Sequence, residues 1–110
     1  MENECKKYAI SINNEMLEYY NGNVTNEDGE QASIWDYIAE NALDVEYTLD
    51  SNKRLIGVCV YVTLGGPTCW IDTRRNTVTC HWGSDSAEVY IDNDLSDEIT
   101  SIYDDGTFSN

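Results

Sequence analysis

The chain has 110 residues, of which 41% are hydrophobic and 11% aromatic, a composition that argues against disorder. The chain has six basic and 21 acidic residues, so its formal net charge is -15 at pH 7. This magnitude exceeds the roughly 2–8 units that suit a small soluble domain. The length indicates one domain over residues 1–110, and the charge makes nucleic acid and anionic membranes poor direct partners.

The N-terminal part predicts two helices. Tyr8, Ile12, Met16 and Tyr20 recur at helical spacing, and the following Asn-Gly-Asn sequence is a stop signal. A second helix is expected over residues 30–43. Its predicted buried stripe comprises Ile34, Trp35, Ile38, Ala42 and Leu43. The first twelve residues lack the apolar segment of a secretory signal peptide, so we expect a soluble intracellular protein.

The middle of the chain changes to an alternating pattern, which predicts strands. Val45, Tyr47 and Leu49 alternate with polar residues over 45–49, and strands are expected over 54–63, 68–73, 77–82 and 87–91. In the second of these, Ile56, Val58, Val60 and Val62 are predicted to share one face. Short Gly-, Pro- and Asn-containing segments join the strands, as in an antiparallel meander.

The C-terminal part predicts a third helix. Leu95, Ile99, Ile102 and Tyr103 have amphipathic helical spacing, and Asn93 or Asp94 can cap the helix. We therefore predict an α+β fold with two N-terminal helices, a four- to five-stranded antiparallel meander and a C-terminal helix. The helices are expected to cover one face of the sheet.

The cysteines show no metal-binding or redox spacing. Cys5, Cys59, Cys69 and Cys80 include no C-x-x-C pair, and without an export signal we expect free, buried thiols rather than disulfides. A zinc site that uses His81 with three of the cysteines is the alternative. It is disfavoured because the adjacent Cys80 and His81 would point to opposite faces of a strand.

The sequence offers little catalytic chemistry. His81 is the single histidine, and no serine or cysteine lies in a nucleophile-elbow pattern. Paired carboxylates are abundant, but they need a cleft that sets their pKa values or holds a metal. We predict a protein without catalytic residues, cofactor or bound metal.

The acidic residues are the main functional signal. No Lys or Arg follows Arg75, while carboxylates continue to the C-terminus. Carboxylates on a folded scaffold can approximate the phosphate spacing of a duplex and bind a basic protein groove. The predicted partner-binding residues are Asp85, Glu88, Asp92, Asp94, Asp97 and Glu98, with Asp44, Glu46 and Asp50 as a second cluster. Exposed tyrosines such as Tyr37 or Tyr90 are candidate anchors in the same interface.

One segment resembles a known group of proteins. The sequence GGPTCWIDT over residues 65–73, followed by Trp82-Gly83, resembles small acidic proteins of phages and mobile elements in Gram-positive bacteria. Those proteins carry a GGPxxx[ILV]DT hairpin and usually a Trp pair where this chain has Trp82 alone. The size and acidity resemble anti-CRISPR and antirestriction proteins, which implies an inhibitor of a bacterial defence nuclease. It would act in the cytoplasm of the host cell, against a CRISPR effector, as a partial nucleic-acid mimic.

Two other interpretations stay open. The protein is alternatively an acidic adaptor or immunity-type protein that binds one specific basic protein without mimicking nucleic acid. A homodimer is favoured if one sheet face is uncovered and bears Tyr61, Trp70 or Trp82.

Overall fold

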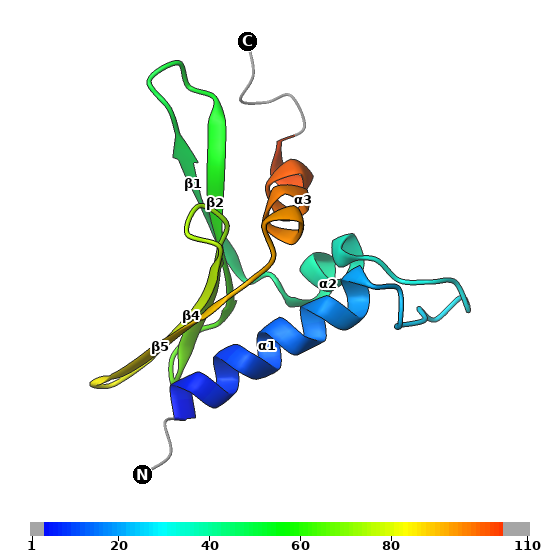
Figure 1. Cartoon of the computed structure of the whole chain (residues 1–110), viewed down its shortest axis with the longest axis horizontal. Coiled ribbons are helices and arrows are strands. Elements are labelled where there is room, and N and C mark those ends of the chain that lie inside the picture. The colour runs from blue at the N-terminus through cyan, green and yellow to red at the C-terminus, as the bar shows by residue number, and fades with distance from the viewer. Residues whose placement is uncertain (1–3, 105–110) are drawn as a thin grey trace.

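The computed structural model describes residues 4–104, which form three helices and one five-stranded antiparallel sheet (Figure 1). The helices are α1 (Glu4–Tyr20), α2 (Ile34–Asn41) and α3 (Asn93–Tyr103). The strands are β1 (Asp44–Leu49), β2 (Leu55–Thr63), β3 (Thr68–Asp72), β4 (Thr77–Trp82) and β5 (Asp85–Tyr90). The predicted α+β class is confirmed.

The sheet is a meander, because the strand order β1-β2-β3-β4-β5 follows the chain and each neighbouring pair is antiparallel. Polar side chains shape its turns. The Asp50 carboxylate accepts the backbone N–H groups of Asn52 and Arg54 at 2.8 and 3.0 Å, respectively, in the β1–β2 turn. The Asp72 carboxylate does the same for Arg74 and Arg75 between β3 and β4. These Asx-type bonds favour the turns over continued strands.

All three helices lie on the same side of the sheet (Figure 1). α1 packs along β4 and β5, α3 packs on β2, and α2 contacts both of these helices. The register places Val60, Ile71 and Val78 side by side on the helix side, in a row that Val45 and Val89 extend to the two edge strands. The opposite side carries no helix among residues 4–104, and we call it the open face.

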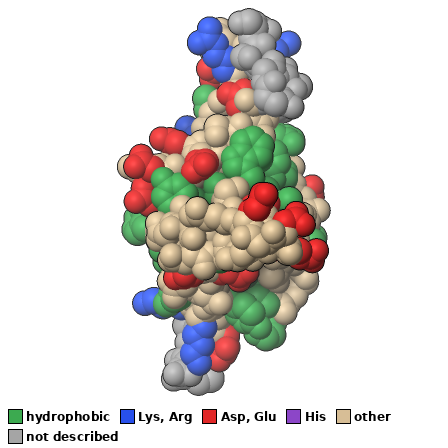
Figure 2. Space-filling model, turned by 90° about the vertical axis from the view of Figure 1, so that its right-hand side faces the viewer, with side chains coloured by type: hydrophobic (Ala, Val, Ile, Leu, Met, Phe, Trp, Pro, Cys, Tyr) green, Lys and Arg blue, Asp and Glu red, His purple; other side chains and the backbone are tan. Residues whose placement is uncertain are grey.

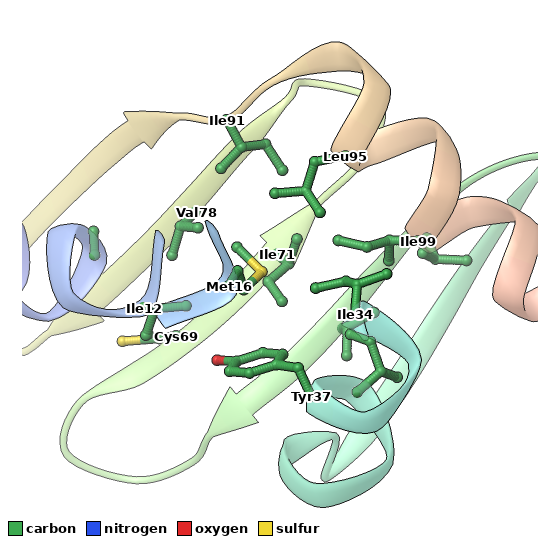
Figure 3. Packing of buried hydrophobic residues seen from close by; sticks show 14 of the residues in the cluster. Ile12, Met16, Ile34, Tyr37, Cys69, Ile71, Val78, Ile91, Leu95 and Ile99 are labelled. Carbon is green, nitrogen blue, oxygen red and sulfur yellow. The ribbon is translucent and has the colours of Figure 1, made fainter. Parts of the chain in front are cut away.

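The hydrophobic core fills the space between the sheet and the helices (Figure 3). Each helix contributes apolar residues at helical spacing, because one stripe of each faces the sheet. The labelled members are Ile12 and Met16 from α1, Ile34 and Tyr37 from α2, Leu95 and Ile99 from α3, and Cys69, Ile71, Val78 and Ile91 from the sheet and the segment after it.

α2 is shorter than predicted and buries fewer residues. Ser33 precedes it as the N-cap, and the Asp36 carboxylate accepts the Ser33 backbone N–H at 2.7 Å, so the helix begins at Ile34 instead of residue 30. Trp35 and Leu43 were predicted to be buried but are 52% and 60% exposed. A helix of eight residues has only a narrow stripe of side chains that faces the core, and Trp35 lies outside it. Leu43 is exposed because it follows the end of the helix.

The predicted common face of β2 is wrong at one residue. Val58 and Val60 face the core, but Ile56 is exposed. The pairing with β1 shifts at this point, since Thr48 pairs with Gly57 whereas the next residue, Leu49, pairs with Leu55. A bulge of this kind inserts an extra residue and changes the face to which the following side chains point.

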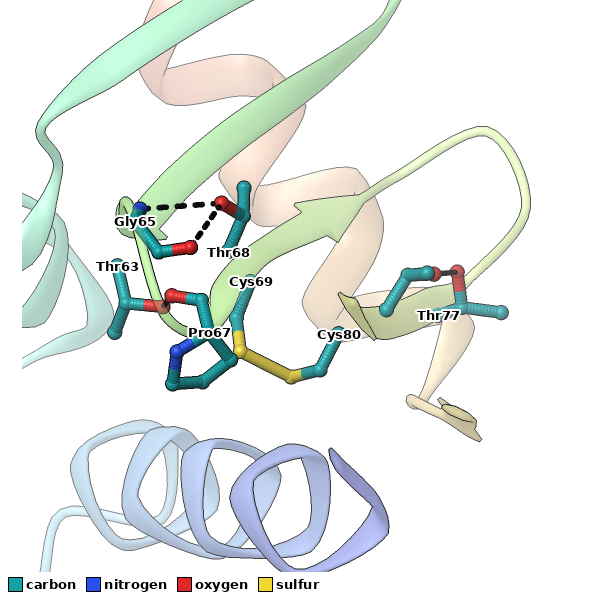
Figure 4. Close-up of a disulfide and its surroundings, with 8 residues drawn as sticks. Thr63, Gly65, Pro67, Thr68, Cys69, Thr77 and Cys80 are labelled. Atoms are coloured by element: carbon teal, nitrogen blue, oxygen red, sulfur yellow. Dashed lines mark hydrogen bonds between the residues drawn. A yellow bond between two sulfur atoms is a disulfide. The ribbon is translucent and has the colours of Figure 1, made fainter. Parts of the chain in front are cut away.

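A disulfide joins Cys69 to Cys80, so the prediction of free thiols is wrong for these two residues (Figure 4). They are directly paired across β3 and β4, with their Cα atoms 4.1 Å apart, and both side chains are fully buried on the helix side. Cys5 and Cys59 remain free. The register of the β3–β4 hairpin brings these two cysteines within bonding reach, whatever the compartment.

We expect the disulfide to be detectable and stabilising. An alkylating reagent added to the unreduced, denatured protein should label two cysteines, and all four after reduction. Reduction should lower the free energy of unfolding by about 2–3 kcal/mol, because the bond closes a loop between residues separated by 11 positions. Mass spectrometry and urea titration measure the two effects. Labelling of all four cysteines without prior reduction would show that the disulfide is absent.

Candidate functional site

The structure separates the nine predicted partner-binding carboxylates instead of joining them in one surface. Asp92, Asp94, Asp97 and Glu98 lie at the start of α3 or within it. Asp44 and Glu46 lie on β1, whereas Glu88 lies on β5 at the opposite edge of the sheet. Asp50 is in the β1–β2 turn, and Asp85 begins β5. Their role in partner binding stays a prediction.

The four carboxylates of α3 form one group, which we call the α3 acidic patch. The N-cap is Asp92 and not the predicted Asn93 or Asp94, and its carboxylate accepts the backbone N–H of Asp94 at 2.8 Å. Desolvation raises the pKa of the nearby Tyr20 hydroxyl, and the charges of Asp94, Glu98 and Asp92 raise it further. Three of the four carboxylates are therefore close enough to act on one hydroxyl group, at the junction of α1 and α3.

The helix side bears acidic side chains among apolar and uncharged ones (Figure 2). Asp and Glu side chains are spread over it, while Lys and Arg side chains lie mainly toward the top and bottom of the view. A hollow of about 260 Å³ also opens between α1, α2 and α3. It is lined by Tyr19, Tyr20, Gly22, Gln31, Ala32, Ser33, Ile34 and Glu98.

The open face carries a different arrangement, in which acidic and aromatic side chains adjoin. Strand register defines two rows that cross all five strands. One row is Asp44, Tyr61, Trp70, Thr79 and Glu88, and the other is Glu46, Cys59, Asp72, Thr77 and Tyr90. His81 projects from the same face, two residues along β4 from Thr79.

On the open face the Trp70 ring contacts two other rings, those of Tyr61 and His81. The Tyr61 and Trp70 ring centroids are 5.6 Å apart, and the Trp70 and His81 rings are stacked with centroids 5.1 Å apart. Aromatic pairs at such distances stabilise a sheet surface and restrict the rings. Tyr61 also donates its hydroxyl proton to Glu46 Oε1, and mainly this bond raises the pKa of Tyr61 to about 12. The phenol is therefore fixed at both its ring and its hydroxyl.

Cys59 lies in the same region but is no candidate nucleophile. Burial, with the negative charges of Asp72 and Glu46, raises the pKa of this thiol to about 11. A reactive cysteine needs an electropositive environment that favours the thiolate, and this environment opposes it.

The open face becomes basic beyond these rows, at the β3–β4 turn. The aliphatic part of Arg74 lies over Gly57, where a Cβ atom would come within 2.1 Å of Arg74 Cγ. Arg75 Nη2 approaches Glu88 Oε1 and Oε2 at 3.0 Å each. Glu88 is predicted to bind a cation of the partner in place of a nucleic-acid phosphate. In this structure it already has a cationic neighbour, Arg75, in its own chain.

Two more of the predicted residues have structural tasks. Backbone N–H groups of the β1–β2 turn are bound to Asp50 and lower the pKa of its carboxyl, so this charge stabilises the turn. Of the two proposed aromatic anchors, Tyr37 is only 2% exposed and belongs to the core, whereas Tyr90 is 82% exposed. Tyr37 is therefore excluded as an anchor in the folded chain.

The residues considered for a metal site are divided between the two sides of the sheet. Cys59 and His81 lie on the open face, while Cys69 and Cys80 are bonded to each other on the helix side. Among residues 4–104 no three His, Cys, Asp or Glu side chains group as metal ligands do. None of the helices in this range has the length and apolar character needed to cross a membrane.

Sequence reasoning placed the acidic residues but missed their aromatic neighbours. The sequence predicts Tyr61 and Trp70 only as parts of an uncovered face and does not mark Asp72 as a site residue. Their signal was present, since strand alternation places Tyr61 and Cys59 on the face opposite to Val58 and Val60.

Comparison of the chain with protein-family models, curated proteins and solved structures found no match.

Proposed function

We propose that this protein is a non-enzymatic inhibitor that binds the basic nucleic-acid-binding surface of a bacterial defence nuclease. The observation that carries the proposal is the charge, with 21 acidic residues against six basic ones. Even if every cation paired with one carboxylate, 15 carboxylates would remain for a partner. A CRISPR effector is the target class that the sequence resemblance implies.

The α3 acidic patch supports a contact of this kind. Asp92, Asp94 and Asp97 are exposed on one short helix, and Glu98 lies at its side. A series of carboxylates on a rigid helix can bind the Lys and Arg side chains that otherwise contact a phosphate backbone. In this role α3 would act as a partial nucleic-acid mimic.

The salt dependence of inhibition tests the proposal. The protein is titrated against a CRISPR effector loaded with its guide RNA, and cleavage of a matching DNA target is measured at 50 and 200 mM salt. We expect inhibition that weakens at least about tenfold at the higher concentration, because charge pairing with a phosphate-binding groove is strongly screened. Unchanged cleavage at both concentrations would contradict the proposed target class.

The contacts of Tyr61, Trp70 and His81 favour the second candidate function, an adaptor or immunity-type protein for one specific basic partner. Interfaces anchored by aromatic residues depend less on salt than those formed by exposed charges. A partner recovered by pull-down whose affinity changes less than about threefold between the same salt concentrations would favour this alternative.

A further inference from the structure

The acidic end of the open face has the composition of a binding site for a cation. Asp44 and Glu46 are exposed on β1, and the half-buried Tyr61 ring lies beside them on β2. We propose that this end of the open face binds an arginine-bearing segment of the protein partner. The inference rests on the proposed function in one respect, namely that the partner is a basic protein.

The hydrogen bonds of the two carboxylates orient them without using all of their acceptors. Glu46 Oε1 accepts the Tyr61 hydroxyl, and Asp44 Oδ1 accepts the backbone N–H of Val45 at 2.9 Å. Each carboxylate has a second oxygen in a position set by the first. Side chains that are already held in place lose little conformational entropy when a ligand binds, which favours affinity.

The aromatic contacts fix the ring in the same way. Trp70 packs against Tyr61 and is itself stacked on His81, so the phenol is supported from β3 and β4. A guanidinium group is planar, stacks on aromatic rings and offers paired N–H donors to carboxylates. A lysine ammonium group matches the charge of this site. It is not planar, however, so it cannot stack on the ring and offer paired donors to a carboxylate as a guanidinium group does.

The uncovered Tyr61 and Trp70 meet the sequence criterion for a homodimer, but the charges of the face oppose a second copy, as they oppose phosphate. Phosphate would be repelled by Asp44, Glu46 and Asp72, and two copies of the chain would each bring a net charge of -15 to a common interface. Arg74 and Arg75 lie toward the other end of the face and would repel a basic segment. This asymmetry directs the arginine to Asp44 and Tyr61, at the end of the strands opposite to the β1–β2 and β3–β4 turns.

Nuclear magnetic resonance with two matched peptides tests the inference. The probes are a nine-residue peptide of alternating arginine and threonine and its lysine counterpart. We expect the arginine peptide to shift the indole N–H signal of Trp70, and the lysine peptide to bind at least about fivefold more weakly. The signal of Trp35, on the helix side, is the internal control. Equal binding of both peptides, or equal shifts of both signals, would overturn the assignment.

Matched variants separate a specific site from general attraction. Asp44→Asn with Glu46→Gln removes two charges from the site, and Glu27→Gln with Asp28→Asn removes two from an exposed loop. The first pair should weaken arginine-peptide binding at least about fivefold and the second less than about twofold. Tyr61→Phe, which keeps the ring, should retain more affinity than Tyr61→Val. Equal effects of the two pairs, or of the two Tyr61 variants, would argue against the site.

The outcomes distinguish this inference from the proposed function. Nuclease inhibition that is unaffected by the Asp44 and Glu46 changes overturns the arginine site and leaves the function standing. Peptide binding at Trp70 without nuclease inhibition supports the arginine site and overturns the proposed function. Sedimentation of the free protein at twice its mass of 12.5 kDa, with the Trp70 signal protected, would assign the face to a second copy instead.

Discussion

Reversing three charges of the α3 acidic patch, by Asp94→Lys, Asp97→Lys and Glu98→Lys, is expected to lower the affinity for the target nuclease at least about a hundredfold. Each single reversal at an exposed rim has a small effect, but three together replace attraction by repulsion over one helix face. Asp92 is left unchanged because it caps α3. Titration of nuclease inhibition measures the loss, and circular dichroism shows whether α3 persists.

A control variant changes the net charge by the same amount elsewhere. Glu27→Lys, Asp28→Lys and Glu30→Lys all lie in the exposed loop between α1 and α2. This variant should lose less than about tenfold in affinity, because its charges act on the partner only at long range. If the two variants weaken inhibition equally, net charge and not the α3 acidic patch determines binding. If the α3 variant folds and inhibits normally, the patch has no part in it.

Leu95→Ala is expected to lower the free energy of unfolding by about 3–4 kcal/mol. Leu95 is fully buried at the first turn of α3 and lies in the core near Ile91 and Ile99 (Figure 3). Truncation removes apolar burial and leaves a cavity, and such changes typically cost about 2–5 kcal/mol. Urea unfolding followed by tryptophan fluorescence measures the difference.

Leu43→Ala provides the matched control for this prediction. It is the same chemical change at a residue that is 60% exposed, so the loss should stay below about 1 kcal/mol. Equal losses in the two variants would mean that α3 is not held to the sheet by its apolar stripe. A stable Leu95→Ala variant with a lower helix content would mean that α3 contributes little to the core.

The strands were predictable because their signals are local. Alternation in β1, β3 and β4 and the turn residues between strands required only neighbouring positions, and these boundaries agree closely with the structure. Ile56 and α2 were mispredicted for reasons that are not local. The bulge opposite Leu49 depends on the partner strand, and α2 begins late because Ser33 and Asp36 together form a capping box.

The candidate site was predictable in composition but not in arrangement. The sequence identified Asp44, Glu46 and the α3 carboxylates as members of an acidic set, since the 21 acidic residues of the chain outnumber its six basic ones. The predicted meander implies that β1 and β5 lie at opposite edges, but the sequence could not show that Arg75 neighbours Glu88. The Cys69–Cys80 bond was missed similarly, because it follows from the β3–β4 register and not from cysteine spacing.

The order of elements along the chain has a consequence for synthesis on the ribosome. Each strand of the meander pairs with the one just made, so the sheet can grow hairpin by hairpin as the chain emerges. α1 is made first, yet the strands that cover it, β4 and β5, are made last. Cys5, Ala9, Ile12 and Met16 therefore stay without their final contacts until most of the chain has been translated. Until then, the acidic charge of the nascent chain opposes its aggregation.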